Sequence, residues 1–177
     1  MITRDQITVP DFYQGYLKAA KEQELLPALR NNRKKFLKFL GEIPKERRDY
    51  AYAEGKWTLR ELLQHMIDTE RVFSFRALWF ARQDPSPLPG FDENNWAKTV
   101  NQDKRRWKDL REEFEIVRRS TICLFDSFSE EQLLRTGISN NNMMSVAAFG
   151  FVSAGHVEHH IKVIRERYLK IRLEEVL

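Results

Sequence analysis

Apolar residues recur every three or four positions over long stretches of this sequence, and clusters of glycine and proline separate those stretches. After Thr58, for example, the apolar positions are Leu59, Leu62, Leu63, Met66, Phe73 and Ala77. This spacing places side chains on one face of an α-helix, whereas no stretch alternates apolar and polar residues for long enough to predict a sheet. The pattern therefore predicts an all-α fold built from amphipathic helices.

The first periodic stretch, residues 11–41, contains a proline that divides it. Pro27 is tolerated only in the first turn of a helix, so we expect a break near 21–24, between a short helix and a longer one that ends at Gly41.

The second long helix begins where Thr58 and Glu61 match a capping box, in which the two side chains bond free amides at the helix start. It is expected to end near Arg82. Residues 84–90 follow and contain three of the six prolines, which predicts a stiff connection. With so long a connection, the middle helices need not be adjacent antiparallel neighbours.

The second half of the sequence predicts two more long helices. The third long helix runs from about 103 to 128, and Ser129 then caps a short helix. The polar run 139–142 is expected to be a loop, and the last helix is expected to run from about Ser145 to about Leu173. No internal repeat or linker is visible, so we expect one domain, residues 1–177, folded as a four-helix bundle with a few short helices.

The composition excludes several classes of protein. One Cys among 177 residues can form no internal disulfide and offers no thiolate pair for zinc. No apolar run approaches the roughly 18 residues of a membrane span, and the first five residues lack the apolar core of a signal peptide. We therefore expect a reduced, cytoplasmic protein with no membrane partner. Cys123 itself lies in the middle of a predicted helix and is expected to be buried or half-buried, not a nucleophile.

The charge pattern favours no particular partner. Lys and Arg exceed Asp and Glu by 30 to 26, but the two signs are interleaved along the sequence. Short basic clusters are typical of solvated helix faces, and no recognition motif accompanies them. A nucleic-acid partner is therefore not expected.

All four histidines fall in two predicted helices: His65 in the second long helix, and His156, His159 and His160 in the last. At about 100° per residue, His156 and His160 lie one turn apart at the edge of the apolar stripe, whereas His159 lies nearer the polar side. Two imidazoles at this spacing can bind one divalent ion, and His65 is the only other histidine available as a third ligand. Three imidazoles and a water form an open site of the kind that catalytic metals use. The spacing alone is weak evidence, because such histidine pairs also arise by chance.

Charged residues occupy two positions in the apolar stripes. Glu70 and Arg118 are both expected to be buried, and a buried lone charge is costly, so we expect them to pair. The alternative is that Glu70 binds or orients a metal ion. Asp68 follows His65 by three residues and is a candidate to orient that ring or to act as a general base. Its alternative role is that of an exposed acid near Arg71.

Four segments occur in an order that resembles a known family: residues 52–58 (YAEGKWT), 64–71 (QHMIDTER), 88–92 (LPGFD) and 155–160 (GHVEHH). Together they resemble the DinB-like superfamily of damage-inducible bacterial proteins, which is related to the YfiT-type metal-dependent hydrolases. The resemblance covers nearly the whole chain.

This resemblance implies a four-helix bundle with an unusual long crossover, often dimeric. It also implies a divalent metal held by His65, His156 and His160. Some members of the superfamily are thiol-S-transferases that use bacillithiol or mycothiol, and others resemble hydrolases or isomerases. Imidazole ligands suit zinc, nickel, copper and iron alike, so the metal is not identified by its ligands.

The first functional hypothesis is a divalent-metal-dependent enzyme that activates water or a low-molecular-weight thiol, of hydrolase or thiol-S-transferase type, with zinc, nickel or iron as cofactor. Its substrate would be a small molecule, and a homodimer is expected. His159, Asp68 and Glu70 are the candidate residues for proton transfer or for support of the metal ligands. The alternative is a non-catalytic, stress-related metal-binding bundle that acts as a dimer.

Overall fold

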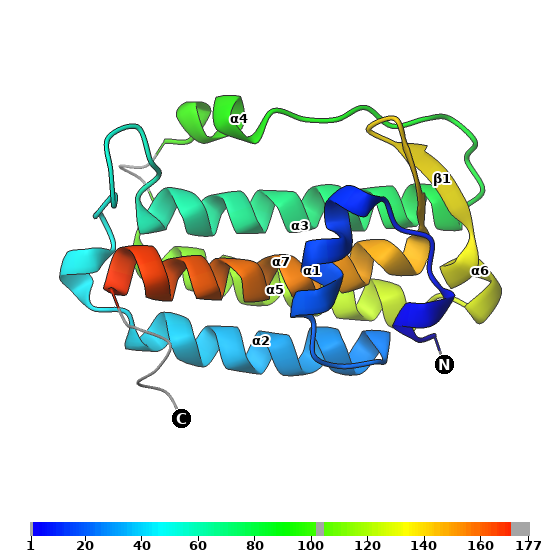
Figure 1. Cartoon of the computed structure of the whole chain (residues 1–177), viewed down its shortest axis with the longest axis horizontal. Coiled ribbons are helices and arrows are strands. Elements are labelled where there is room, and N and C mark those ends of the chain that lie inside the picture. Colours follow the sequence, from blue (N-terminus) through cyan, green and yellow to red (C-terminus); the bar gives the residue numbers. More distant parts are fainter. Residues whose placement is uncertain (1, 102–104, 171–177) are drawn as a thin grey trace.

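The computed structural model describes residues 2–101 and 105–170. Four long helices pack as a bundle: α2 (Leu25–Glu42), α3 (Leu59–Ala81), α5 (Trp107–Asp126) and α7 (Val146–Val163) (Figure 1). Short helices lie around it: α1 (Gln14–Ala19), α4 (Glu93–Thr99) and α6 (Glu130–Leu134). The prediction of an all-α four-helix bundle with short extra helices is confirmed.

The helix starts follow from local chemistry. Thr58 accepts a hydrogen bond from the Glu61 amide, and the Glu61 carboxylate accepts one from the Thr58 amide at 2.7 Å, so the capping box forms as predicted. Pro27 lies in the first turn of α2, after the predicted break. The third long helix was expected from about 103, but α5 begins at Trp107, and residues 102–104 lie outside the described part of the chain.

The long connection between α3 and α5 sets the topology. Residues 82–101 return along the length of the bundle, with α4 lying over α3, and α3 and α5 are neighbours that run in the same direction (Figure 1). An up-and-down bundle with short loops would make consecutive helices antiparallel. The predicted long crossover is therefore present.

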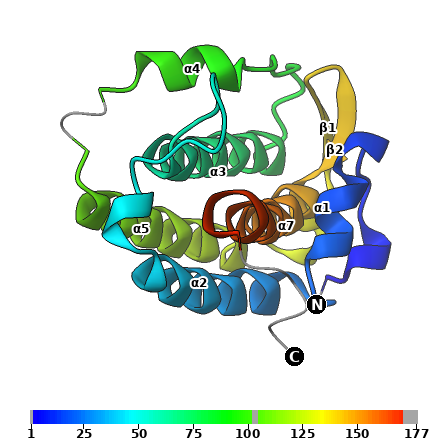
Figure 2. The same ribbon diagram turned by 60° about the vertical axis from the view of Figure 1, so that its left-hand side comes forward.

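Helix α7 lies at the centre of the molecule, where it packs against α1, α2 and α3 (Figure 2). Fourteen of its eighteen residues are buried. At Gly155 the backbone of α1 comes so close that a side chain would collide with the Tyr16 carbonyl, so only glycine fits there. A π-helical turn, Ile164–Leu169, follows α7. The expected end near Leu173 lies outside the described residues.

A β-hairpin replaces the loop that was expected at 139–142. Strands β1 (Thr136–Ser139) and β2 (Asn142–Ser145) pair antiparallel. Asn140 and Asn141 join them with φ of 49° and 60°, the left-handed values that a two-residue hairpin turn requires. The backbone of Leu88 bonds to the hairpin through Ile138 and Asn140, each at 2.9 Å. The hairpin therefore anchors the start of the crossover.

The expected buried ion pair is present. The Arg118 guanidinium donates two hydrogen bonds to the Glu70 carboxylate, at 2.6 and 2.9 Å, and both residues are at most 2% exposed. Arg118 also donates to the Asn32 side chain at 2.6 Å and so ties α5 to α2 as well as to α3. The expected burial of Cys123 was wrong, because its side chain is exposed.

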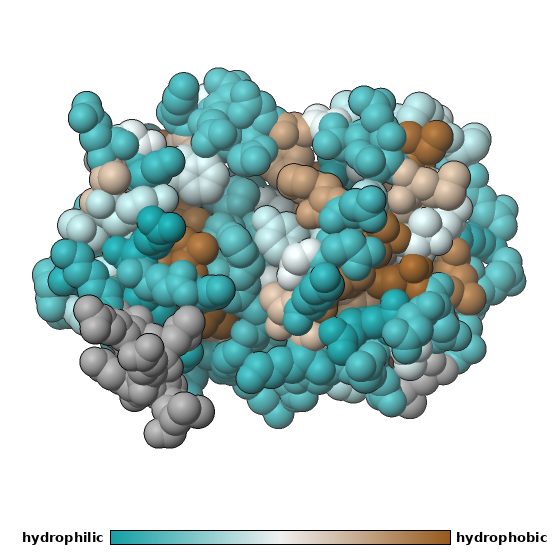
Figure 3. Space-filling model, viewed as in Figure 1, coloured by the Kyte–Doolittle hydropathy of each residue, from teal (hydrophilic) through white to brown (hydrophobic). Residues whose placement is uncertain are grey.

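Hydrophilic residues cover most of the face seen in Figure 3, and the larger hydrophobic patches lie on its right-hand half, where the N-terminal segment and the hairpin pack. None of the helices in the described part of the chain combines the length and the hydrophobicity that a membrane span requires.

Candidate metal centre

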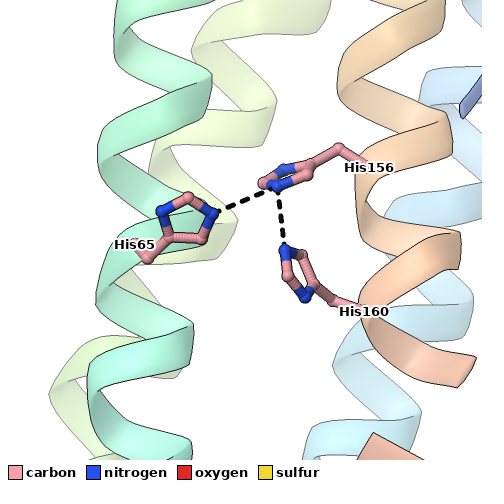
Figure 4. A group of neighbouring side chains, drawn as sticks. All are labelled: His65, His156 and His160. Carbon is pink, nitrogen blue, oxygen red and sulfur yellow. Dashed lines mark hydrogen bonds between the residues drawn. The ribbon is translucent and has the colours of Figure 1, made fainter. Parts of the chain in front are cut away.

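Three histidine side chains meet between α3 and α7 (Figure 4). The Nε2 atom of His156 lies 3.2 Å from Nε2 of His65 and 2.9 Å from Nε2 of His160. His156 and His160 project from successive turns of α7, and His65 faces them from α3, the helix with the most extensive contact with α7. The structure therefore brings together three of the four histidines.

The convergence of these nitrogen atoms leaves hydrogen bonding unsatisfied. A neutral imidazole nitrogen carries either one hydrogen or one lone pair, so Nε2 of His156 can serve only one of its two close neighbours. Three ligands about 2.0–2.1 Å from a tetrahedral ion would lie about 3.3 Å apart, which is close to the two distances measured from Nε2 of His156, and all three nitrogen atoms lie within 4.8 Å of one another. The donor set and its spacing therefore fit a divalent cation.

Burial keeps the three rings neutral at physiological pH. It lowers the pKa of His65 to about 4. Burial also lowers the pKa of His156 and His160 well below the ordinary value, and the neighbouring histidines lower both further. Because metal ligation requires the lone pair of a neutral ring, these depressed pKa values favour a cation over protons at this position.

The metal-free protein is expected to lose stability as the pH falls from about 6.5 to about 4. His65 takes up a proton near pH 6.5 when unfolded but only near pH 4 when folded, so the unfolded state binds more protons throughout this window. The resulting loss from His65 alone is on the order of 3 kcal/mol. Urea unfolding at several pH values measures it. A His65→Phe variant should show a shallower pH dependence between about 6.5 and 5, and an unchanged slope would contradict this account.

Residues that the sequence did not indicate surround the three rings. The Thr69 hydroxyl lies 3.5 Å from Nδ1 of His65, so a proton on Nδ1 can bond to it and leave Nε2 free as a ligand. The Trp57 ring packs on His65 with centroids 4.8 Å apart, and the Tyr16 ring packs edge-on against His156 at 5.4 Å. Of these residues, only Thr69 could have been found from the sequence, because it follows His65 by one helical turn and so lies on the same face.

The three candidates for supporting roles are placed differently. Asp68 is half-buried and accepts hydrogen bonds from Gln64 and Arg71, and it lines a small cavity beside His65. Glu70 uses both carboxylate oxygens to bind Arg118.

His159, the third of these candidates, is exposed on the outer side of α7. Its ring packs against those of His160 and Tyr16, with centroids 5.1 and 5.3 Å away. It does not belong to the group of converging nitrogen atoms, in keeping with its place on the helical wheel.

A cavity of about 290 Å³ opens in front of the three histidines. Residues 90–93 of the crossover form one wall, and the N-terminal segment around Tyr13 and Tyr16 forms another. Aromatic residues supply most of the apolar lining: Phe12, Tyr13, Tyr16, Trp57, Phe73 and Phe91. Such a cavity, with a few polar groups among aromatic walls, is typical of a small-molecule site.

Comparisons with known proteins point to one family. The model for the DinB superfamily matches residues 28–164. A protein of Oceanobacillus iheyensis named "Putative metal-dependent hydrolase" is 29% identical over 117 residues, which are 65% of this chain and 66% of that protein. A protein of the same name from Geobacillus kaustophilus is 26% identical over 83 residues, 47% of each chain. The matches thus span slightly less than two thirds of the first relative and about half of the second.

Two solved structures share the fold. YfiT from Bacillus subtilis, described as a probable metal-dependent hydrolase with an unusual four-helix bundle topology, aligns with a TM-score of 0.68 and 15% identity over 93% of this chain and 90% of that one. The mycothiol-dependent maleylpyruvate isomerase aligns with a TM-score of 0.61 and 16% identity, over 86% of this chain and 62% of that one. At these identities the likeness shows a common fold.

Proposed function

The chain belongs to the DinB superfamily, and from that membership and the geometry of its histidines we propose that it is a divalent-metal-dependent enzyme acting on a small molecule. His65, His156 and His160 are the proposed ligands. The observation that carries the proposal is the convergence of three neutral Nε2 atoms at one end of an open cavity. Only three protein ligands meet there among the described residues, which leaves room for a reacting molecule.

A divalent ion at such a site supplies Lewis acidity, which favours deprotonation of a water or thiol ligand and so provides a nucleophile. The chain itself fixes the ligands. Thr69 bonds Nδ1 of His65, while Trp57 and Tyr16 hold the rings of His65 and His156 and exclude water from one side.

Of the three candidates for proton transfer, Asp68 and His159 remain available for that role. Asp68 lines the small cavity beside His65, which is separate from the cavity of about 290 Å³, and the exposed ring of His159 packs against that of His160. Glu70 is bound by Arg118 in a buried ion pair, so we assign it a structural role in the bundle and not a role in proton transfer.

The aromatic cavity suits a small organic substrate, with water or a low-molecular-weight thiol as the nucleophile. The mycothiol-dependent neighbour is consistent with the thiol alternative.

The test is metal-dependent turnover. Protein freed of metal by a chelator and reloaded with zinc, nickel or iron is assayed on ester and amide substrates, and on electrophiles supplied with a small thiol. We expect product formation that chelation abolishes and metal restores. Stoichiometric metal binding without turnover on any substrate would favour the non-catalytic metal-binding bundle instead, and a lack of metal affinity would exclude both functions.

A further inference from the structure

A buried arginine lies in the same cavity as the three histidines. The Arg76 residue is only 4% exposed, yet it lines the cavity that His65, His156 and His160 share. Its guanidinium donates a hydrogen bond of 2.6 Å to the carbonyl oxygen of Pro89, and the Tyr13 side chain lies close enough to interact with it. The bond to Pro89 uses one of its five N–H donors and leaves others for another partner.

Arg76 has no carboxylate partner in the described part of the chain. None of the ion pairs formed there within 4 Å includes it. Arg118, the other arginine that is at least nine-tenths buried, binds the Glu70 carboxylate through two hydrogen bonds. A buried cation is costly unless an anion compensates it. The comparison therefore shows one arginine that is neutralised within the bundle and one that faces the cavity without a counter-ion.

The position of Arg76 relative to His65 follows from helix geometry. Both residues belong to α3, eleven positions apart, so they differ by about 20° around the helix and by about 16 Å along its axis. Thr69 and Phe73 line the cavity between them. One molecule extended along this face could therefore contact the histidines at one end and the guanidinium at the other.

We propose that Arg76 binds a carboxylate of the substrate, while the opposite end of the same molecule lies at the three histidines. Only one part of this inference rests on the proposed function, namely that the reacting end of the molecule lies at the three histidines. A carboxylate matches the planar fork of a guanidinium, and the Tyr13 hydroxyl beside it adds a neutral donor. A phosphate dianion fits less well, because no other arginine or lysine among the described residues lines the cavity, whereas the carboxylate of Glu93 does.

The experiment uses ω-mercaptoalkanoic acids of increasing chain length and their matching amides as probes, each titrated into metal-free and zinc-loaded protein near neutral pH. The acid and the amide differ only in charge at one end, so the ratio of their affinities measures the preference for a carboxylate that is attributed to Arg76. Zinc loading acts on the thiol end of both, so the gain in affinity on loading reports the metal site. At the best chain length we expect the acid to bind about tenfold more tightly than the amide.

Variants assign the preference to the side chain. In Arg76→Gln the acid and the amide should bind equally, with the affinity of the amide unchanged. Arg76→Lys keeps the charge but not the fork, and it should retain only part of the preference. Arg82→Gln is the matched control, because it removes an exposed arginine at the C-cap of the same helix that contacts Phe128 outside the cavity, and it should preserve the full ratio.

The outcomes separate the two proposals. A ratio near one in the wild-type protein, at every chain length, overturns the role of Arg76, whether or not its variants fold. The same holds if Arg76→Gln lowers the melting temperature but leaves the ratio intact, because Arg76 would then only hold the crossover at Pro89. A preserved ratio with no gain on zinc loading would refute the metal site alone.

Discussion

Replacing His156 with alanine is expected to abolish stoichiometric metal binding. His156 is the middle of the three proposed ligands, with its Nε2 atom close to those of both His65 and His160, and the rings of His65 and His160 lie on different helices. Loss of a supporting hydrogen bond around a metal ligand already costs 10–100-fold in affinity, so loss of the ligand itself should cost at least about a hundredfold. Metal content after dialysis and the dissociation constant for zinc measure the effect.

His159→Ala is the matched control for this experiment. It removes the fourth histidine from the exposed side of the same helix and should leave the metal content unchanged. Circular dichroism of both variants establishes that the bundle is folded. Equal loss of metal in the two variants, or full retention in His156→Ala, would show that the converging nitrogen atoms are not the binding site.

The second large effect concerns the buried ion pair, and Glu70→Gln is expected to lower the free energy of unfolding by about 3–5 kcal/mol. The variant leaves the Arg118 guanidinium fully buried without its counter-ion. Arg118 also donates to the Asn32 side chain and to the Ser153 carbonyl, so the loss extends to α2 and α7. Urea unfolding of the purified variant measures the change.

Two comparisons distinguish this account from general disruption. Asp126→Asn removes one charge of an exposed ion pair, that of Arg30 with Asp126, and should change stability by no more than about 1 kcal/mol. The double variant Glu70→Leu with Arg118→Met replaces both charges by apolar groups and should recover much of the loss. If Glu70→Gln behaves like the exposed control, the ion pair does not stabilise the bundle.

Much of the fold could be predicted because its signals are local. The capping box at Thr58 and Glu61 and the proline in the first turn of α2 fix helix starts through contacts within a few residues. The hairpin could not be predicted in this way. Its strands have four residues each, too few to show alternation, and the turn depends on left-handed backbone at Asn140 and Asn141. Helix α4 also escaped prediction, since its seven residues include one large apolar side chain, Trp96, and therefore show no helical periodicity.

For the site as well, the residues that local spacing positions could be predicted, and those that distant segments contribute could not. The spacing of His156 and His160 places both rings on one face, and His65 was the only other histidine that could join them from another helix. The aromatic walls could not be predicted, because they come from distant segments. Tyr16 reaches His156 only because α1 packs against Gly155, and the wall at Phe91 depends on the path of the crossover.

The central place of α7 has a consequence for the order in which the molecule can form. During synthesis α1, α2, α3 and α5 leave the ribosome before α7, and until then the apolar faces that α7 covers have no permanent partner. The pairing of α7 with α1 also joins segments more than a hundred residues apart. A bundle that closes through such distant contacts is expected to fold more slowly than an up-and-down bundle of equal length.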